Sequence, residues 1–374
     1  MRVLLLGEYS GLNNELKLAL IKAGHDVTLA AACDFFKNFK TDINLGYGST
    51  IYSYKMRQFL LPLLNLSKFS GFDVVHVINF YIIPRLPFLN LFLIKFLKEN
   101  NGLVTLSGAG DDPFYVKYSE RAMRYSPIPS HELIDRQGRP YYMRKQAHLD
   151  AMHKYMNYID AVIPIIFEFH ATFCAAGYSE KTLKPIPIPI DTKKIEFSEN
   201  RVSNGKVVFF HGLNRRGFKG TFLIEKSFQE LEKKYPKDVE CIIDGNLPFD
   251  RYLALLSIMN VNLDQVFSYS LAMNSLYSMA QGKVVCGGAE QESTVLYDGV
   301  LPPVYNLIPD QAQITEVLET VLERRDQLAS HSEMSRAFVE RYHNPEVVAN
   351  LYLKSWLSLL ARKVQLAKDD KGDQ

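Results

Sequence analysis

A loop rich in glycine and basic side chains carries the strongest chemical signal in the sequence. It spans residues 211–220, follows an apolar run, and contains Arg215, Arg216 and Lys219. A guanidinium offers a bidentate fork and an ammonium a point charge, which together suit a diphosphate that departs with negative charge. We therefore predict that Lys219 and Arg215 are catalytic cations and that Arg216 helps to bind the substrate that carries the diphosphate. The alternative is a solvated basic loop.

A second loop, residues 264–282, combines a carboxylate with the start of a helix. Asp264 directly follows an apolar run, and the helical pattern begins near Ser270. The free N–H groups of a helix N-terminus bind phosphate, and the helix dipole adds about 0.3–1 kcal/mol. We assign Asp264, Ser270, Met273 and Asn274 to the same substrate site. A capped helix without a ligand is the alternative.

Two further glycine-containing loops follow apolar runs in the first half of the chain. Gly11 lets the backbone approach a ligand closely, although its loop lacks the GxGxxG pattern of dinucleotide-binding proteins. Residues 106–112 end in the adjacent carboxylates Asp111 and Asp112. We predict that Gly11 binds the diphosphate substrate and that Asp111 is a catalytic base or an anchor for the second substrate. A tight turn at Gly11 and helix N-caps at the two aspartates are the alternatives.

The elements that position these loops repeat with the spacing of a parallel sheet. Residues 2–7 form a continuous apolar run, typical of a strand buried on both faces. A helical pattern and a second strand follow, and such a crossover joins parallel neighbours. Strands are predicted at 2–7, 25–30, 74–78, 103–106 and 161–164, helices at 15–23, 89–97 and 143–158, and an elaborated loop at 111–140.

The second half restarts the same pattern after a polar linker. Its strands are predicted at 206–210, 240–245, 261–264 and 283–286, and its helices at 221–234, 248–257 and 271–281. We predict an α/β protein with one Rossmann-like doubly wound domain at 1–197 and a second at 198–344. Residues 345–374 are expected to form a helix that crosses back to the first domain and ends in a frayed tail. Ligands of parallel sheets bind at the carboxyl ends of the strands, so the two domains should face one another across a cleft.

Residues 185–292 resemble the donor-binding half of the retaining GT-B glycosyltransferases of family 4. The ordered segments that carry the resemblance are 187–191 ("P-N-G-V-D"), 207–220 ("v-f-v-G-R-l…K-G"), 242–245 ("i-v-G-d-G") and 260–288 ("A-D-V…E-G-F-G…E-A-M-A-x-G-k-P-V"). Residues 22–27 and 72–76 are similar to "k-x-G-H-e-V" and "f-D-v-v-H" of the first domain. The resemblance implies that Arg215 and Lys219 clamp a donor diphosphate and that Asp244 lies beside the nucleobase.

The sequence departs from the family at its paired glutamates, which fall on Tyr269 and Tyr277. The first glutamate usually supports the transferred sugar and the second the ribose hydroxyls. Tyr277 keeps a hydroxyl for the ribose, whereas Tyr269 supplies no carboxylate. The clamp arginine is displaced as well, because Leu213 stands at its usual place.

The resemblance implies a retaining glycosyltransferase that moves a sugar from a UDP- or GDP-sugar to a glycan or lipid-linked acceptor in bacterial surface polysaccharide synthesis. The nucleotide sugar is a co-substrate, so we expect no cofactor and no metal requirement. Loss of both glutamates motivates an alternative, a non-catalytic GT-B subunit that binds a glycan or a partner glycosyltransferase. An epimerase or hydrolase on the same scaffold is a third interpretation.

Composition limits the partners and the cellular compartment that we expect for this protein. The net charge of +2 argues against a nucleic-acid partner, and no cluster of His, Cys, Asp or Glu has metal-ligand spacing. The four cysteines (Cys33, Cys174, Cys241 and Cys286) show no CxxC spacing, which favours buried free thiols in a reducing compartment. With no secretion signal in the sequence, we expect a cytoplasmic protein.

A membrane surface is a further predicted partner. The apolar run 80–97 is interrupted by Pro84, Arg85, Pro87 and Lys95, so it does not span a bilayer unaided. Together with the basic side chains of residues 117–145 it predicts peripheral attachment to an anionic membrane through the first domain. The alternative is a buried helix beside a solvated basic stretch.

Overall fold

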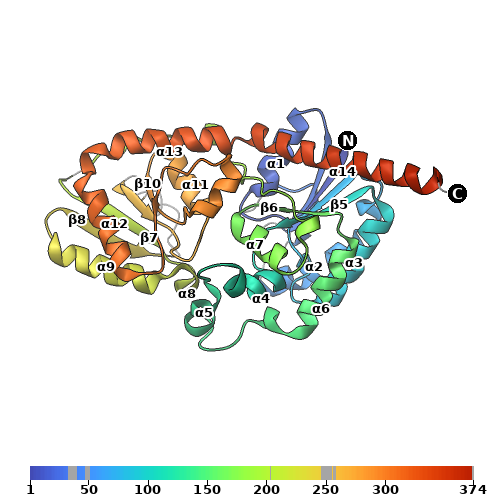
Figure 1. Cartoon of the computed structure of the whole chain (residues 1–374), viewed down its shortest axis with the longest axis horizontal. Coiled ribbons are helices and arrows are strands. Elements are labelled where there is room, and N and C mark those ends of the chain that lie inside the picture. Colours follow the sequence, from blue (N-terminus) through green and yellow to red (C-terminus); the bar gives the residue numbers. More distant parts are fainter. Residues whose placement is uncertain (33–39, 47–50, 203, 246–254, 256–257, 373–374) are drawn as a thin grey trace.

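The protein folds as two parallel sheets, each covered by helices, that face one another along the long axis of the molecule (Figure 1). The computed structural model describes residues 1–32, 40–46, 51–202, 204–245, 255 and 258–372. The predicted helix at 248–257 and Cys33 lie outside these residues, except for Leu255. The thiols of Cys174, Cys241 and Cys286 are free, and Cys286 is buried.

The first sheet has six parallel strands in the order β3-β2-β1-β4-β5-β6. Its central strand β1 is apolar on both faces, and Val3, Leu4, Leu5 and Leu6 are all buried. The order reverses between β1 and β4, which places a crevice at the carboxyl ends of these two strands. The strands are β1 (Arg2–Leu6), β2 (Asp26–Ala32), β3 (Ile43–Gly46), β4 (Val74–Val77), β5 (Leu103–Gly108) and β6 (Ala161–Pro164).

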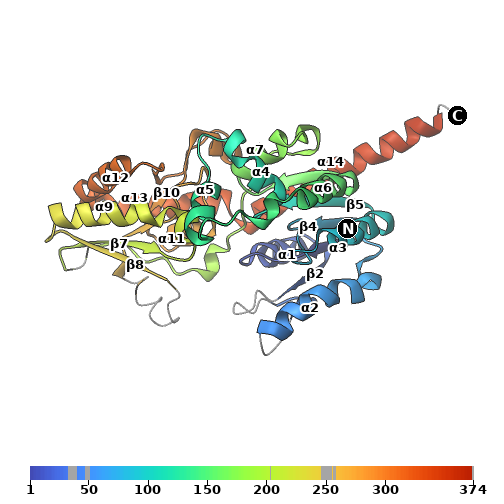
Figure 2. The ribbon, with the colours of Figure 1, turned by 90° about the horizontal axis from the view of Figure 1, so that it is seen from below.

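The helices of the first domain are α1 (Leu12–Lys22), α2 (Ile51–Leu64), α3 (Pro87–Asn100), α4 (Pro113–Ala122), α5 (Ile128–Ser130), α6 (Gln146–Tyr155) and α7 (Phe167–Ala175). The stretch 111–140, predicted as an elaborated loop, contains α4, α5 and the short helical turn η2 (His131–Asp135). The helix predicted at 143–158 is shorter, because 3-10 turns replace its two ends. Figure 2 shows α2 at the lower edge of this domain.

The second sheet has five parallel strands in the order β11-β10-β9-β7-β8, which reverses between β7 and β9. The strands are β7 (Val207–Gly212), β8 (Val239–Asp244), β9 (Val261–Leu263), β10 (Val284–Gly287) and β11 (Tyr305–Asn306). The helices are α8 (Arg216–Lys219), α9 (Thr221–Lys234), α11 (Met273–Ala280), α12 (Gln311–Glu323) and α13 (Leu328–Tyr342). Because α11 begins at Met273, Ser270 lies in the loop before the helix rather than at its start.

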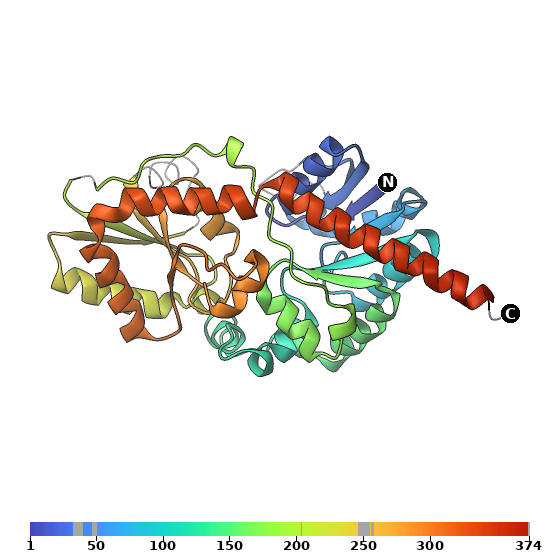
Figure 3. The same cartoon turned by 45° about the horizontal axis from the view of Figure 1, so that its top comes forward.

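The last helix, α14 (Pro345–Gly372), leaves the second domain and lies across the first (Figure 3). Its buried residues Val348, Tyr352 and Trp356 pack against the face of the first sheet that carries Val3 and Leu5. The Tyr352 ring meets that of the buried His76 edge-on, with centroids 5.1 Å apart. The first half of α14 therefore completes the core of the first domain.

Candidate functional site

A cavity of about 390 Å³ lies between the two domains, at the carboxyl ends of strands from both sheets. The first domain contributes loops that follow β1, β5 and β6, and the second contributes loops that follow β7 and β9. Residues of the lining include Tyr9, Asp111, Glu168, Arg215, Gln265 and Met273. The structure thus brings together the loops that the sequence singled out.

Arg215 joins the two walls of this cavity. Its Nη2 lies 2.8 Å from Asp111 Oδ2, an atom that also accepts a hydrogen bond of 2.8 Å from the Tyr141 hydroxyl. The guanidinium carbon lies 3.5 Å from the centre of the Phe218 ring, which holds the side chain in a cation–π contact. Arg215 and Asp111, predicted as catalytic residues, therefore form an ion pair in the cleft.

Lys219 lies beneath the loop, in a buried network with two other predicted residues. Its Nζ is 3.0 Å from Asp264 Oδ1, which also accepts a hydrogen bond of 3.3 Å from the Asn274 amide. The Lys219 and Asp264 side chains are only 12% and 3% exposed. Burial alone would raise the pKa of Asp264, but Lys219 and hydrogen bonds from Ser275 and Asn274 lower it overall. Arg216 points elsewhere and pairs with Glu225 on α9.

The N-terminus of α11 opens on the cavity without a cap. Ala272 precedes the helix in an extended conformation and gives no side-chain hydrogen bond, and both Ala272 and Met273 line the cavity. The first amide groups of a helix have no partner within it. This end of α11 can therefore bind an anion, and the guanidinium of Arg215 lines the same cavity.

The corresponding helix ends of the first domain carry carboxylates of their own. Glu8 accepts hydrogen bonds from Gly11 N at 2.9 Å and Asn14 N at 2.8 Å, so it occupies the amides at the start of α1. Gly11 itself takes the left-handed conformation (φ 92°) of a tight turn. Asp112 caps α4 through Phe114 N and Tyr115 N. Of the two adjacent aspartates, Asp112 is thus the N-cap and Asp111 faces the cleft.

Asp112 is fully buried, and burial raises its pKa to about 7, with a smaller contribution from the charge of Asp111. Hydrogen bonds from the two capped amides act in the opposite direction. This carboxyl therefore changes its charge near neutral pH while it caps a helix at the cleft.

The remaining predicted residues of the second domain, Asp244, Ser270 and Tyr277, do not line this cavity. Asp244 ends β8 and accepts a hydrogen bond of 2.7 Å from Gly245 N. Ser270 is buried, and its hydroxyl accepts a hydrogen bond of 3.1 Å from Phe167 N of the first domain. Tyr277 lies on α11 with 38% of its surface exposed. Tyr269 is turned toward the first domain, where its ring stacks on that of Tyr125 at 4.5 Å.

A second cavity, of about 310 Å³, lies in the first domain beside the cleft. Four tyrosines and two amide side chains line it, namely Tyr9, Tyr81, Tyr141, Tyr142, Gln58 and Asn79, and both Tyr9 and Asp111 line the two cavities. Aromatic faces with a few placed polar groups are typical of small-molecule sites. Within the residues that the structure describes, no group of three or more His, Cys, Asp or Glu side chains is placed to hold a metal ion.

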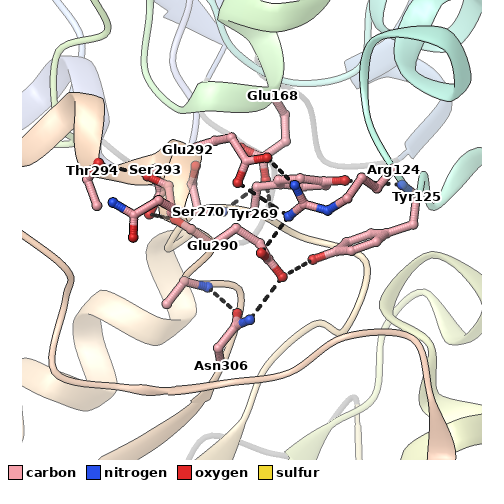
Figure 4. Close-up of polar contacts among 12 residues, drawn as sticks. Arg124, Tyr125, Glu168, Tyr269, Ser270, Glu290, Glu292, Ser293, Thr294 and Asn306 are labelled. Atoms are coloured by element: carbon pink, nitrogen blue, oxygen red, sulfur yellow. Dashed lines mark hydrogen bonds and ion pairs between the residues drawn. The ribbon is translucent and has the colours of Figure 1, made fainter. Parts of the chain in front are cut away.

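The sequence did not reveal the polar contacts that join the two domains beside the cleft (Figure 4). Arg124 of the first domain pairs with Glu290 at 2.5 Å and with Glu292. The Tyr125 hydroxyl donates to Glu290 at 2.8 Å. Glu168, at the start of α7, accepts hydrogen bonds from the second domain. As an acidic residue within the apolar stretch 161–176, Glu168 was the one signal that sequence reasoning could have used.

Comparison with solved structures identifies the fold. No protein-family model and no curated protein matches the sequence. Among solved structures, sucrose-phosphate synthase from Thermosynechococcus elongatus is similar with a TM-score of 0.64 at 13% identity, over 97% of this chain and 100% of that one. Anabaena HepE in complex with UDP-glucose gives a TM-score of 0.61 at 11% identity, over 96% and 100%.

A third similar structure is WaaG, a glycosyltransferase of lipopolysaccharide biosynthesis, with a TM-score of 0.53 at 13% identity over 94% of this chain and 99% of that one. Coverage of nearly the whole of each chain shows that both domains and their arrangement are shared. The chain has the GT-B fold, and the predicted fold class is confirmed.

Proposed function

We propose that this GT-B chain is a glycosyltransferase that moves a sugar from a UDP- or GDP-sugar to a glycan or lipid-linked acceptor, with retention of configuration and without a metal. The observation that carries the proposal is the cleft itself. Arg215 and the uncapped N-terminus of α11 line one cavity, opposite Asp111 of the other domain. The complex of HepE with UDP-glucose and the role of WaaG in lipopolysaccharide biosynthesis support this substrate class.

The ion pair between Arg215 and Asp111 indicates how the two substrates are coupled. A donor diphosphate at the start of α11 competes with Asp111 for the Arg215 guanidinium, because phosphate binds arginine through the same fork as carboxylate. Arg215 then stabilises the negative charge of the departing nucleoside diphosphate. Asp111, released from that pair, accepts a hydrogen bond from the acceptor hydroxyl in the neighbouring cavity of the first domain.

The other predicted residues take supporting parts in this proposal. Asp244 and Tyr277 contact the nucleoside, and Ser270 and Asn274 hold the loop and helix start that bind the diphosphate. Lys219 is a second cation for the diphosphate, placed behind the cleft by its pair with Asp264. Cations thus neutralise the diphosphate, so we expect activity to persist in EDTA. Loss of activity on chelation, restored by Mg²⁺, would contradict this part of the proposal.

A non-catalytic GT-B subunit is the second candidate, and specific observations favour it. Tyr269 and Tyr277 stand where the family has glutamates, and carboxylates of the protein already pair with Arg215 and Lys219. The discriminating experiment incubates the protein with UDP-glucose, UDP-N-acetylglucosamine, UDP-galactose or GDP-mannose and either polyprenyl-linked or free oligosaccharides. Acceptor-dependent release of UDP or GDP supports the transferase. Saturable nucleotide-sugar or glycan binding without release supports the non-catalytic subunit.

We also propose peripheral attachment to an anionic membrane through the first domain. No helix in the described part of the chain is long and apolar enough to cross a bilayer. On α3, Phe88 and Phe92 are 71% and 53% exposed and share one helix face. Arg124 and Arg144 of the basic stretch 117–145 are ion-paired to glutamates, whereas Lys117 and Arg121 on α4 are exposed.

Flotation with anionic and neutral liposomes at low and high salt tests this attachment. We expect salt-sensitive flotation that requires anionic lipid and weakens in Phe88→Ser/Phe92→Ser and in Lys117→Glu/Arg121→Glu. Failure to float under any of these conditions would rule the attachment out.

A further inference from the structure

Glu168 reaches from the first domain into the loop that precedes α11. Its Oε1 accepts three hydrogen bonds from that loop, from Ser268 Oγ at 2.7 Å, Tyr269 N at 2.7 Å and Ser270 N at 3.1 Å. The residue is only 2% exposed. Figure 4 shows its carboxylate directed at Tyr269 and Ser270. One oxygen of the carboxylate is therefore saturated with donors.

The second oxygen of this carboxylate, Oε2, accepts none of these hydrogen bonds. Oε2 is buried and has no hydrogen-bond partner among the described residues. An ionised carboxylate accepts through both oxygens, and a buried charged atom without donors is costly. Neighbouring polar groups of the protein have thus satisfied one half of Glu168 and left the other for a donor that the protein does not supply.

The position of Glu168 indicates what that donor is. It lines the same cavity as Arg215 and Met273, the residues to which the proposed function assigns the diphosphate. A group bonded to the distal phosphate of a nucleotide sugar lies within this cavity, and a sugar carries several hydroxyl donors. We infer that Glu168 Oε2 accepts a hydrogen bond from a hydroxyl of the transferred sugar, so that the first domain reads the sugar while the second binds the nucleotide. This inference rests on the proposed function.

A purely structural role, in which Glu168 only fixes the loop 268–270, predicts different behaviour. Glu168→Gln separates the two roles. The amide oxygen still accepts the three hydrogen bonds from the loop, while the amide nitrogen replaces Oε2 and turns an acceptor into a donor. A matched control is Asp310→Asn, which makes the same change at the N-cap of α12, a residue that does not line the cavity.

The experiment measures dissociation constants by titration calorimetry for UDP, GDP, UDP-glucose, UDP-N-acetylglucosamine, UDP-galactose and GDP-mannose. For the nucleotide sugar that the wild-type protein binds most tightly, we expect Glu168→Gln to weaken binding about tenfold or more, as for a lost hydrogen bond to a charged group. Binding of the matching free diphosphate should stay unchanged, which also shows that the variant is folded. Asp310→Asn should change neither.

Deoxy analogues of that nucleotide sugar identify the hydroxyl. One analogue should bind the wild-type protein as weakly as the parent compound binds Glu168→Gln, and the variant should not distinguish the two. Equal affinity of wild type and Glu168→Gln for the parent nucleotide sugar would overturn the inference and leave the proposed function standing. Failure of the wild-type protein to bind any of these nucleotide sugars would overturn both.

Discussion

The helix N-termini at the cleft differ between the two domains. In the first domain, Glu8 occupies the amides at the start of α1 and Asp112 those at the start of α4. In the second, α11 begins at Met273, and the preceding Ala272 supplies no side-chain cap. A helix N-terminus favours a negative charge, whether it belongs to the protein or to a ligand. At α1 and α4 the protein itself thus supplies the negative charge, whereas the N-terminus of α11 is open to the negative charge of a ligand.

The largest effect on catalytic activity that we expect follows from removing the cation beside the open N-terminus of α11, Arg215. Arg215→Ala should lower kcat/KM about 100-fold or more, because loss of one group that stabilises a developing anion costs roughly 2.7–4 kcal/mol. Steady-state kinetics with the nucleotide sugar and acceptor measure it. The control is Arg325→Ala, a surface arginine paired with Asp238. An unchanged kcat/KM in Arg215→Ala would remove this residue from the proposed mechanism.

Lys219→Met should affect stability as well as turnover. Removal of the ammonium leaves Asp264 charged and buried, and breaking a buried pair costs about 3–5 kcal/mol. Urea unfolding should show this loss, and Lys219→Met/Asp264→Asn should recover a large part of it. A single variant as stable as the wild-type protein would mean that the pair contributes nothing to the fold.

Ala272→Asp gives α11 the carboxylate that α1 and α4 already have. The backbone of Ala272 is in the extended region that an N-cap adopts (φ −104°, ψ 176°). We expect a gain of about 1 kcal/mol in stability and a loss of about tenfold in affinity for UDP or GDP, because the new charge competes with the diphosphate. Ala272→Asn, an uncharged cap, is the control. Undiminished nucleotide affinity in the aspartate variant would place the diphosphate elsewhere.

The smallest effect concerns Asp112 and pH. Its pKa is raised to about 7 by burial, above its ordinary value of 3.8, so the folded protein binds this proton more tightly than the unfolded chain. The stability that this group contributes is therefore present at acid pH and declines as the pH rises toward and through 7. Between pH 6 and 8, the wild-type protein should lose about 1.3 kcal/mol relative to Asp112→Asn in urea unfolding. Parallel curves for the two proteins would show that Asp112 does not titrate in this range.

Apolar runs predicted most of the sheet because buried parallel strands are apolar on both faces. The run 2–7 became β1, and 161–164 became β6. The edge strand β3 escaped prediction because its sequence, Ile-Asn-Leu-Gly, is not a continuous apolar run. The helix α2, which contains Pro62, escaped prediction as well. A buried central strand can be predicted from its own apolar run. An edge strand depends on the elements that pack beside it, so its own sequence is less informative.

The candidate site was predictable as loops and not as side-chain partners. Strand ends led to Asp111 and Arg215, which line one cavity, and to Asp264, which is buried in its pair with Lys219. Their partners depend on contacts across the fold, because Arg215 and Asp111 are 104 residues apart and Lys219 and Asp264 are 45 apart. Glu168 shows the same limit, since its three donors lie 100 to 102 residues away.

The crossing of α14 has a consequence for the order in which the protein is made. The face of the first sheet that carries Val3 and Leu5 is covered by Tyr352 and Trp356, which follow the whole second domain in the sequence. At translation rates of about 5–20 residues per second, Tyr352 and Trp356 are synthesised roughly 10–40 s after the last strand of this sheet, and until then the α1 residues Leu16 and Leu20 of the same core lack these partners. The core of the domain that is synthesised first is therefore completed only after the second domain has been synthesised.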